Sequence, residues 1–118
     1  MLKDLDFTRY SRVYLICGYT DLRFGQTGLV NLVQFSLGLN PFDPKAVFLF
    51  CGRKASVIKA LVCDEDGMVV MSKRLFKGRY QWPRKPSEAR MLTREQFRHL
   101  MEGFSVENTI PGSDQARL

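Results

Sequence analysis

The sequence predicts a single α+β domain with the element order β-α-β-β-β-α, in which helices pack on a small antiparallel sheet. Three observations lead to this fold class. Four segments are apolar or β-branched over strand length, the last three are separated by short turns, and two other segments carry apolar residues at helical spacing. The chain has 118 residues, which is the length of one domain.

The first half of the chain predicts one strand and one helix. RVYLIC, residues 12–17, is rich in β-forming residues and ends before Gly18. Apolar residues then recur at helical spacing, with Thr20, Asp21 or Thr27 as alternative caps for the start of the helix and Gly38 as its stop. The apolar positions are Leu29, Leu32, Val33 and Leu37.

The middle of the chain predicts an antiparallel meander. AVFLFC, residues 46–51, is continuously apolar, as expected for a central strand that is buried on both faces. SVIKALVC, residues 56–63, and GMVVMSKRLF, residues 67–76, follow as strands joined by the tight-turn sequence DEDG. Connections this short allow only antiparallel neighbours.

A second helix is expected after Leu92. Thr93 and Gln96 have the spacing of a capping box, and Gly103 is suited to end the helix. We therefore expect an irregular segment over residues 1–11, the domain over residues 12–104, and a flexible tail over residues 105–118.

The composition predicts a cytoplasmic protein without a membrane span or a cofactor. The sequence has no apolar run of about 18 residues and no signal-peptide core near its start. Its three cysteines form no C-x-x-C pair, and His99 is its one histidine, so we expect reduced thiols and no metal site.

Two patterns that could carry catalysis are weak. Residues 18–28 hold three glycines before a helix, but they match neither a P-loop nor G-x-G-x-x-G. Asp64, Glu65 and Asp66 could serve a metal-dependent nuclease together with Asp21, but adjacent residues cannot all face one ion, and a hairpin turn explains them more simply. We therefore expect no catalytic residues and no enzymatic activity.

The charge of the protein is concentrated in the stretch KRLFKGRYQWPRK, residues 73–85. The net charge is +6, and this stretch alone holds six basic residues and no acid. A basic patch on a neutral background is typical of a polyanion-binding surface, although a solvated basic loop would have the same composition. Tyr80 and Trp82 could stack on bases or simply cover the sheet. The candidate nucleic-acid-binding residues are Arg23, Arg53, Lys54, Lys59, Lys73, Arg74, Lys77, Arg79, Tyr80, Trp82, Arg84 and Lys85.

A resemblance to a known family rests on several segments in a fixed order. They are VYLICGYTDLRFGQTGL, LVQFSLGLNPFDP, VFLFCGRKASVIKAL, DGMVVMSKRL, GRYQWP and LTREQFRHLMEG, which together run from Val13 to Gly103. In these segments the chain resembles TnpB, the accessory protein encoded by the second open reading frame of IS66-family bacterial insertion sequences. The resemblance implies a role in transposition beside a separate, larger transposase that carries the catalysis. It transfers no catalytic role to any residue.

Two functional hypotheses follow. In the first, the protein is a non-catalytic accessory factor of transposition that binds DNA, mainly through the phosphates of a duplex, by means of its basic strand-exit loop. In the second, the same surface is a protein interaction module that recruits or regulates the transposase without binding DNA itself.

Overall fold

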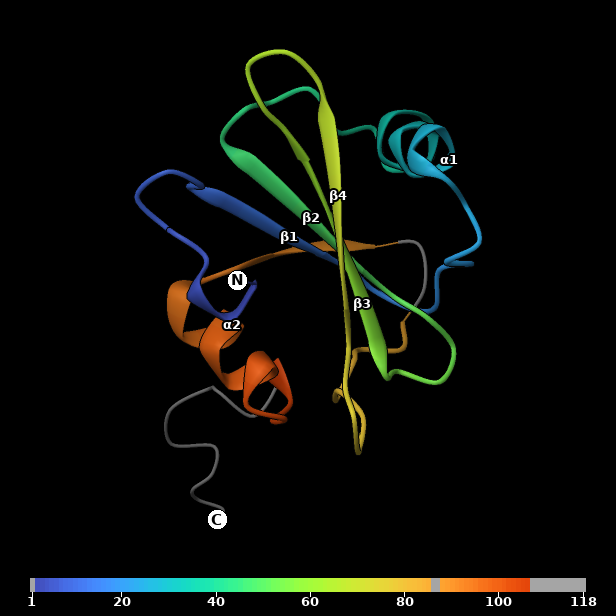
Figure 1. Ribbon diagram of the computed structural model, residues 1–118, viewed down its shortest axis with the longest axis vertical. Helices are drawn as coiled ribbons and strands as arrows, with labels where there is room; N and C mark the ends of the chain where they lie inside the picture. Colours follow the sequence, from blue (N-terminus) through green and yellow to red (C-terminus); the bar gives the residue numbers. More distant parts are fainter. Residues whose placement is uncertain (1, 86–87, 107–118) are drawn as a thin grey trace.

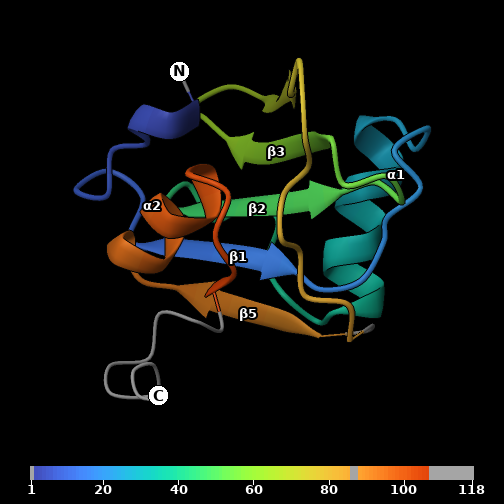
Figure 2. The same cartoon turned by 90° about the horizontal axis from the view of Figure 1, so that it is seen from below.

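The chain forms a five-stranded sheet with helices on both faces (Figures 1 and 2). The structure is a computed structural model and describes residues 2–85 and 88–106. The strand order across the sheet is β4-β3-β2-β1-β5. The strands are β1 (Arg12–Ile16), β2 (Ala46–Cys51), β3 (Val57–Cys63), β4 (Met68–Arg74) and β5 (Ala89–Leu92).

The α+β fold class is confirmed, and so is the meander. β2 pairs with β3 and β3 with β4, both antiparallel. The sheet is nevertheless mixed, because β1 pairs parallel to β2. The chain crosses over through a helical segment between these two strands, so that β2 enters the sheet in the same direction as β1. β5, which the sequence did not predict, pairs antiparallel with β1 at one edge.

The helices lie on opposite faces of the sheet (Figure 1). α1 (Gln26–Asn31) continues directly into a π-helical turn, η2 (Leu32–Ser36), and covers one face with Leu29 and Val33. α2 (Arg94–Met101) covers the other face with Phe97 and Leu100. Both clusters meet on β2, all of whose residues are buried, as the apolar run AVFLFC predicted.

The helix boundaries explain which capping predictions were right. Thr93 and Gln96 form the predicted capping box at the start of α2, and Gly103 has a φ of 95° just beyond its end. The predicted caps of the first helix were wrong, because α1 starts after Gly25. Thr20 is instead buried, and its backbone N–H donates to the Cys51 carbonyl at 2.9 Å, which ties the loop after β1 to the end of β2.

Residues near both termini contribute to the core. Leu2 begins a short 3-10 helix, η1 (Leu2–Asp4), and is buried, as is Val106 after α2. Of the predicted tail, residues 105–118, the part beyond Val106 lies outside the described residues. Each helix within residues 2–85 and 88–106 is too short or too polar to cross a membrane.

Candidate nucleic-acid interface

A basic groove of about 850 Å³ opens where β2 and β4 end and β3 begins. Its floor is made by side chains of β3 and β4, and its walls are the loop after β1 and the turn between β2 and β3. Within residues 2–85 and 88–106, five cations and one carboxylate line it. The basic groove is defined here by its charged residues Asp21, Arg23, Arg53, Lys54, Lys59 and Arg74.

The strand register places the floor residues on one face. Lys59 pairs with Ser72, and Val57 pairs with Arg74. Because side chains alternate along a strand, Lys59 and Val57 share the face that Leu61 presents to α1. The Lys59 ammonium donates to the Leu22 carbonyl at 2.8 Å, so this cation also links the sheet to the loop that forms the wall.

Two backbone hydrogen bonds join the basic turn to the basic stretch. The N–H of Leu75 donates to the Ser56 carbonyl at 2.9 Å, and the N–H of Tyr80 donates to the Ala55 carbonyl at 2.7 Å. Ala55 adopts a φ of 59°, a conformation that costs a non-glycine residue about 1–2 kcal/mol and turns the chain sharply. Arg53 and Lys54 are thereby held beside the segment that follows Arg74.

The one carboxylate of the basic groove is already paired. The Arg23 guanidinium donates to both carboxylate oxygens of Asp21, from Nε at 2.9 Å and from Nη2 at 2.8 Å. This pairing lowers the pKa of Asp21 to about 2 and raises that of Arg23. Asp21 therefore stays ionised at neutral pH, and among the residues that the structure describes no other carboxylate lines the basic groove beside the other four cations.

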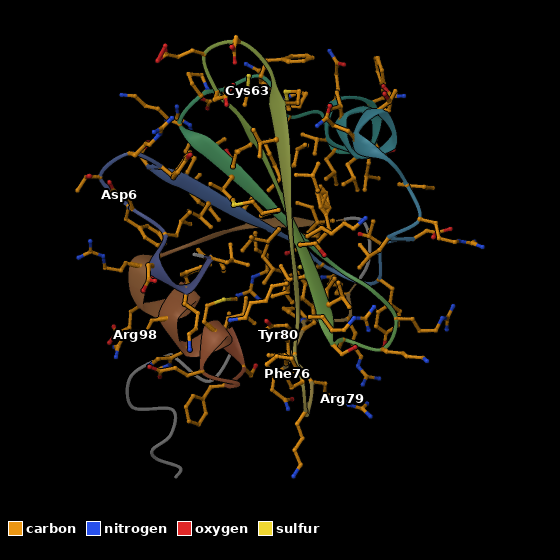
Figure 3. The ribbon with its side chains drawn as sticks, viewed as in Figure 1. Asp6, Cys63, Phe76, Arg79, Tyr80 and Arg98 are labelled. Carbon is orange, nitrogen blue, oxygen red and sulfur yellow. The ribbon has the colours of Figure 1, made fainter. Side chains whose placement is uncertain are left out.

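The remaining predicted cations spread away from the basic groove. Lys77 and Arg79 are exposed on the loop after β4, and Figure 3 shows Arg79 near its tip beside Phe76. Arg84 and Lys85 are exposed farther along, and Lys85 lies 3.9 Å from Glu88. Lys73 is half-buried and pairs with Ile58, so its side chain faces away from the floor of the groove.

The stacking role expected of Tyr80 and Trp82 is corrected by their burial. They are only 2% and 6% exposed and belong to the core cluster under α2. The Trp82 indole N–H donates to the Ile16 carbonyl at 2.9 Å. A buried ring presents no face to an incoming base. Both residues therefore cover the sheet, which was the other role considered for them.

Tyr19 is a candidate that the sequence reasoning missed. Its ring is 44% exposed, lines the basic groove, and lies under the Arg53 guanidinium at 5.7 Å from the ring centroid. The sequence feature that could have identified Tyr19 is its position as an aromatic residue directly after Gly18, in the loop that leaves β1. Such loops carry binding residues more often than strand interiors do.

The carboxylates considered for a nuclease do not meet. Asp21 lies in the basic groove, whereas residues 64–66 form the turn at the opposite end of β3 and β4. Figure 3 shows Cys63, which precedes that turn, far from Arg79. In the part of the chain that the structure describes, no three His, Cys, Asp or Glu side chains are arranged to hold a metal ion.

Fold and groove together define a small α+β domain with one strongly basic surface. The family model of the IS66 Orf2-like proteins matches residues 11–110, so the chain belongs to this family, which is associated with transposition in an accessory role. The resemblance seen in the sequence is thus confirmed.

Two relatives from Sinorhizobium fredii (strain NBRC 101917 / NGR234) are similar to the chain. The uncharacterized protein y4hO is 37% identical over 93 residues, which cover 79% of this chain and 80% of the relative. The uncharacterized protein y4jC is 27% identical over 97 residues, which cover 82% of each chain. No solved structure matches the chain significantly.

Proposed function

We propose that the protein is a non-catalytic accessory factor of IS66-type transposition that binds DNA through the basic groove and the adjoining basic loop, residues 73–85. The observation that carries this proposal is the convergence of Arg53, Lys54, Lys59 and Arg74 on one groove, where the acidic residue Asp21 is already paired with Arg23. The proposed partners are the DNA of the insertion element and its transposase. Because both are found in the bacterial cytoplasm, the proposed location of the protein is also the cytoplasm.

The proposed mechanism is electrostatic. Each cation that contacts a phosphate releases counterions from the DNA, which favours binding without any reading of sequence. Arginine adds directional contacts, because its planar guanidinium can donate two parallel hydrogen bonds to one phosphate. Lys77 and Arg79 on the loop after β4 would extend the same contact along the DNA backbone.

A triple neutralisation tests this proposal. We expect Arg53→Gln/Lys54→Gln/Arg74→Gln to weaken binding to a labelled duplex in fluorescence anisotropy. Each lost phosphate contact should reduce the slope of log K against log salt by about 0.9, so the slope should fall by about 2.7. The matched control is Lys3→Gln/Lys45→Gln/Arg98→Gln, which changes the charge equally at residues that do not line the basic groove. Equal slopes for the two variants would refute the proposal.

A second candidate function is the recruitment of the transposase. Phe76 is fully exposed and lies between Arg74, the last residue of β4, and Lys77, and an exposed aromatic ring beside arginine is typical of a protein-interface anchor. Co-purification with the transposase from a nuclease-treated extract, lost in Phe76→Ala, would support this function. Co-purification that depends on intact DNA would favour the first proposal alone.

A further inference from the structure

An apolar pocket of about 370 Å³ adjoins the basic groove. The two cavities share Tyr19, Thr20 and Asp21 as a common rim. Beyond this rim the walls are mainly apolar, with Phe24 also 42% exposed. The apolar pocket is lined by Ile16, Cys17, Phe24, Leu32, Ser36 and Leu37 in addition to the shared rim.

The inner wall of the apolar pocket depends on the π-helical turn η2. The N–H of Leu37 donates to the Leu32 carbonyl at 3.1 Å, five residues back, which widens the helix at this point. Leu32 and Ser36 of this turn, and Leu37 directly after it, line the apolar pocket. Turns of this kind are rare and frequently occur at functional sites.

We propose that the apolar pocket receives one unpaired base of single-stranded DNA while the basic groove holds the flanking phosphates. This proposal rests on the proposed DNA binding. It adds that the protein prefers single-stranded DNA to duplex DNA. A base has apolar faces and a polar edge. The exposed rings of Tyr19 and Phe24 at the pocket suit the faces, and the hydroxyl of Ser36, an exposed residue of the pocket lining, suits the edge.

Tyr19 is the residue that connects the two cavities. The Arg53 guanidinium lies over its ring, so one cation of the basic groove also helps to orient the aromatic surface offered to the base. A base inside a duplex is stacked on both sides and cannot enter the pocket without being unpaired. The geometry therefore favours single strands, unlike the duplex expected from the sequence.

The charge beside the apolar pocket favours a nucleotide over an apolar peptide side chain. A base on its sugar-phosphate backbone would bring negative charge to the basic groove along with each ring. An acidic peptide with an apolar anchor has a related chemistry, and it is the outcome that the experiment has to exclude.

The test compares an oligothymidylate with an oligomer of equal length in which several central nucleotides are abasic. Both probes carry the same phosphates, so only the base contacts differ. We expect the protein to bind the oligothymidylate about tenfold more tightly, which is the typical effect of stacking one base on an aromatic ring. Tyr19→Ala should abolish this preference without changing the salt slope, and Tyr19→Phe should keep it.

Phe35→Ala serves as the matched control, because Phe35 is a highly exposed ring of η2 that does not line the apolar pocket. Equal binding of both oligomers by the unmodified protein would overturn the base-pocket proposal and leave the proposed function standing. A lack of binding to any DNA at low salt would overturn both. Tyr19-dependent binding of a labelled glutamate-leucine peptide, with no base preference on DNA, would assign the pocket to a protein ligand and overturn the proposal.

Discussion

The indole N–H of Trp82 donates to the carbonyl oxygen of Ile16 at 2.9 Å, across 66 positions of sequence. Close by, the N–H of Gly18 donates to the Pro83 carbonyl at 2.8 Å. These two bonds fasten the C-terminal part of the basic loop to the end of β1. The tip of the loop can therefore be highly charged and exposed, while Trp82 and Pro83 keep the end of the loop fixed against the core.

Removing the indole donor should destabilise the protein. We expect Trp82→Phe to lower the free energy of unfolding by about 1–3 kcal/mol, because the buried Ile16 carbonyl loses its partner and the smaller ring fills less space. Urea denaturation measures this change. Phe76→Ala is the control, and its effect should stay within about 0.5 kcal/mol, since that ring is fully exposed. A loss for Trp82→Phe no larger than that of the control would contradict the structural role assigned to the indole.

Tyr80→Phe should leave stability unchanged or raise it by about 1 kcal/mol. Within the described residues, the buried Tyr80 hydroxyl has no hydrogen-bond partner, so it is desolvated without compensation. Removing it takes away that cost and keeps the packing of the ring. Thermal unfolding followed by circular dichroism is the measurement, and a clear drop in the melting temperature would show that the hydroxyl has a partner in solution.

Alkaline pH should destabilise the protein partly through Cys51. Burial raises the pKa of this thiol from its ordinary value of 9.0 to about 12. Between these values the unfolded chain loses the thiol proton and the folded chain keeps it, so the free energy of unfolding falls as the pH rises. The contribution of one such group is about 1.4 kcal/mol per pH unit.

Cys51→Ala should therefore show a shallower loss of stability above pH 9 than the unmodified protein. Each variant is compared with its own stability at pH 7.5, so that the small cavity left by the substitution cancels. Burial also raises the pKa of Tyr80, so some alkaline destabilisation should remain in the variant. Parallel pH profiles for the two proteins would show that the Cys51 thiol does not titrate as its burial implies.

Asp21→Asn should strengthen DNA binding. The substitution removes the negative charge of Asp21 from the basic groove and releases the guanidinium of Arg23 for a phosphate. A single surface charge of this kind is worth about two- to fivefold in affinity at moderate salt. Asp43→Asn is the matched control, because Asp43 makes a similar 2.7 Å contact with Arg12 outside the basic groove. Anisotropy titrations should show tighter binding for the first variant only, and equal changes in both would indicate a nonspecific effect of net charge.

Local sequence patterns predicted the parts of the fold that local interactions determine. The meander follows from apolar runs joined by tight turns, and α2 follows from the Thr93–Gln96 capping box. β5 was missed because ARML is short and contains the polar Arg90, so its strand conformation depends on pairing with β1. The parallel pairing of β1 with β2 was missed because it depends on how the crossover packs.

Of the candidate site, only the basic residues could be predicted from the sequence. Arg53, Lys54 and Arg74 flank turns or strand ends, where exposed charge is common, and the structure places them around one groove. The groove itself requires the loop after β1 to reach the end of β2, through the bond from Thr20 to Cys51. The sequence left open whether Tyr80 and Trp82 stack on bases or cover the sheet, because an irregular segment has no regular alternation from which to read a side chain's direction.

The position of β1 between β2 and β5 also affects how the chain folds during its synthesis on the ribosome. β1 is made first, but its neighbour on one side, β5, begins only at Ala89. During synthesis β2, β3 and β4 can pair through short turns, while the outer backbone groups of β1 stay without a strand partner. A nascent chain that stalls before Ala89 would expose this edge of unpaired backbone N–H and C=O groups, on which other chains can add a strand and aggregate.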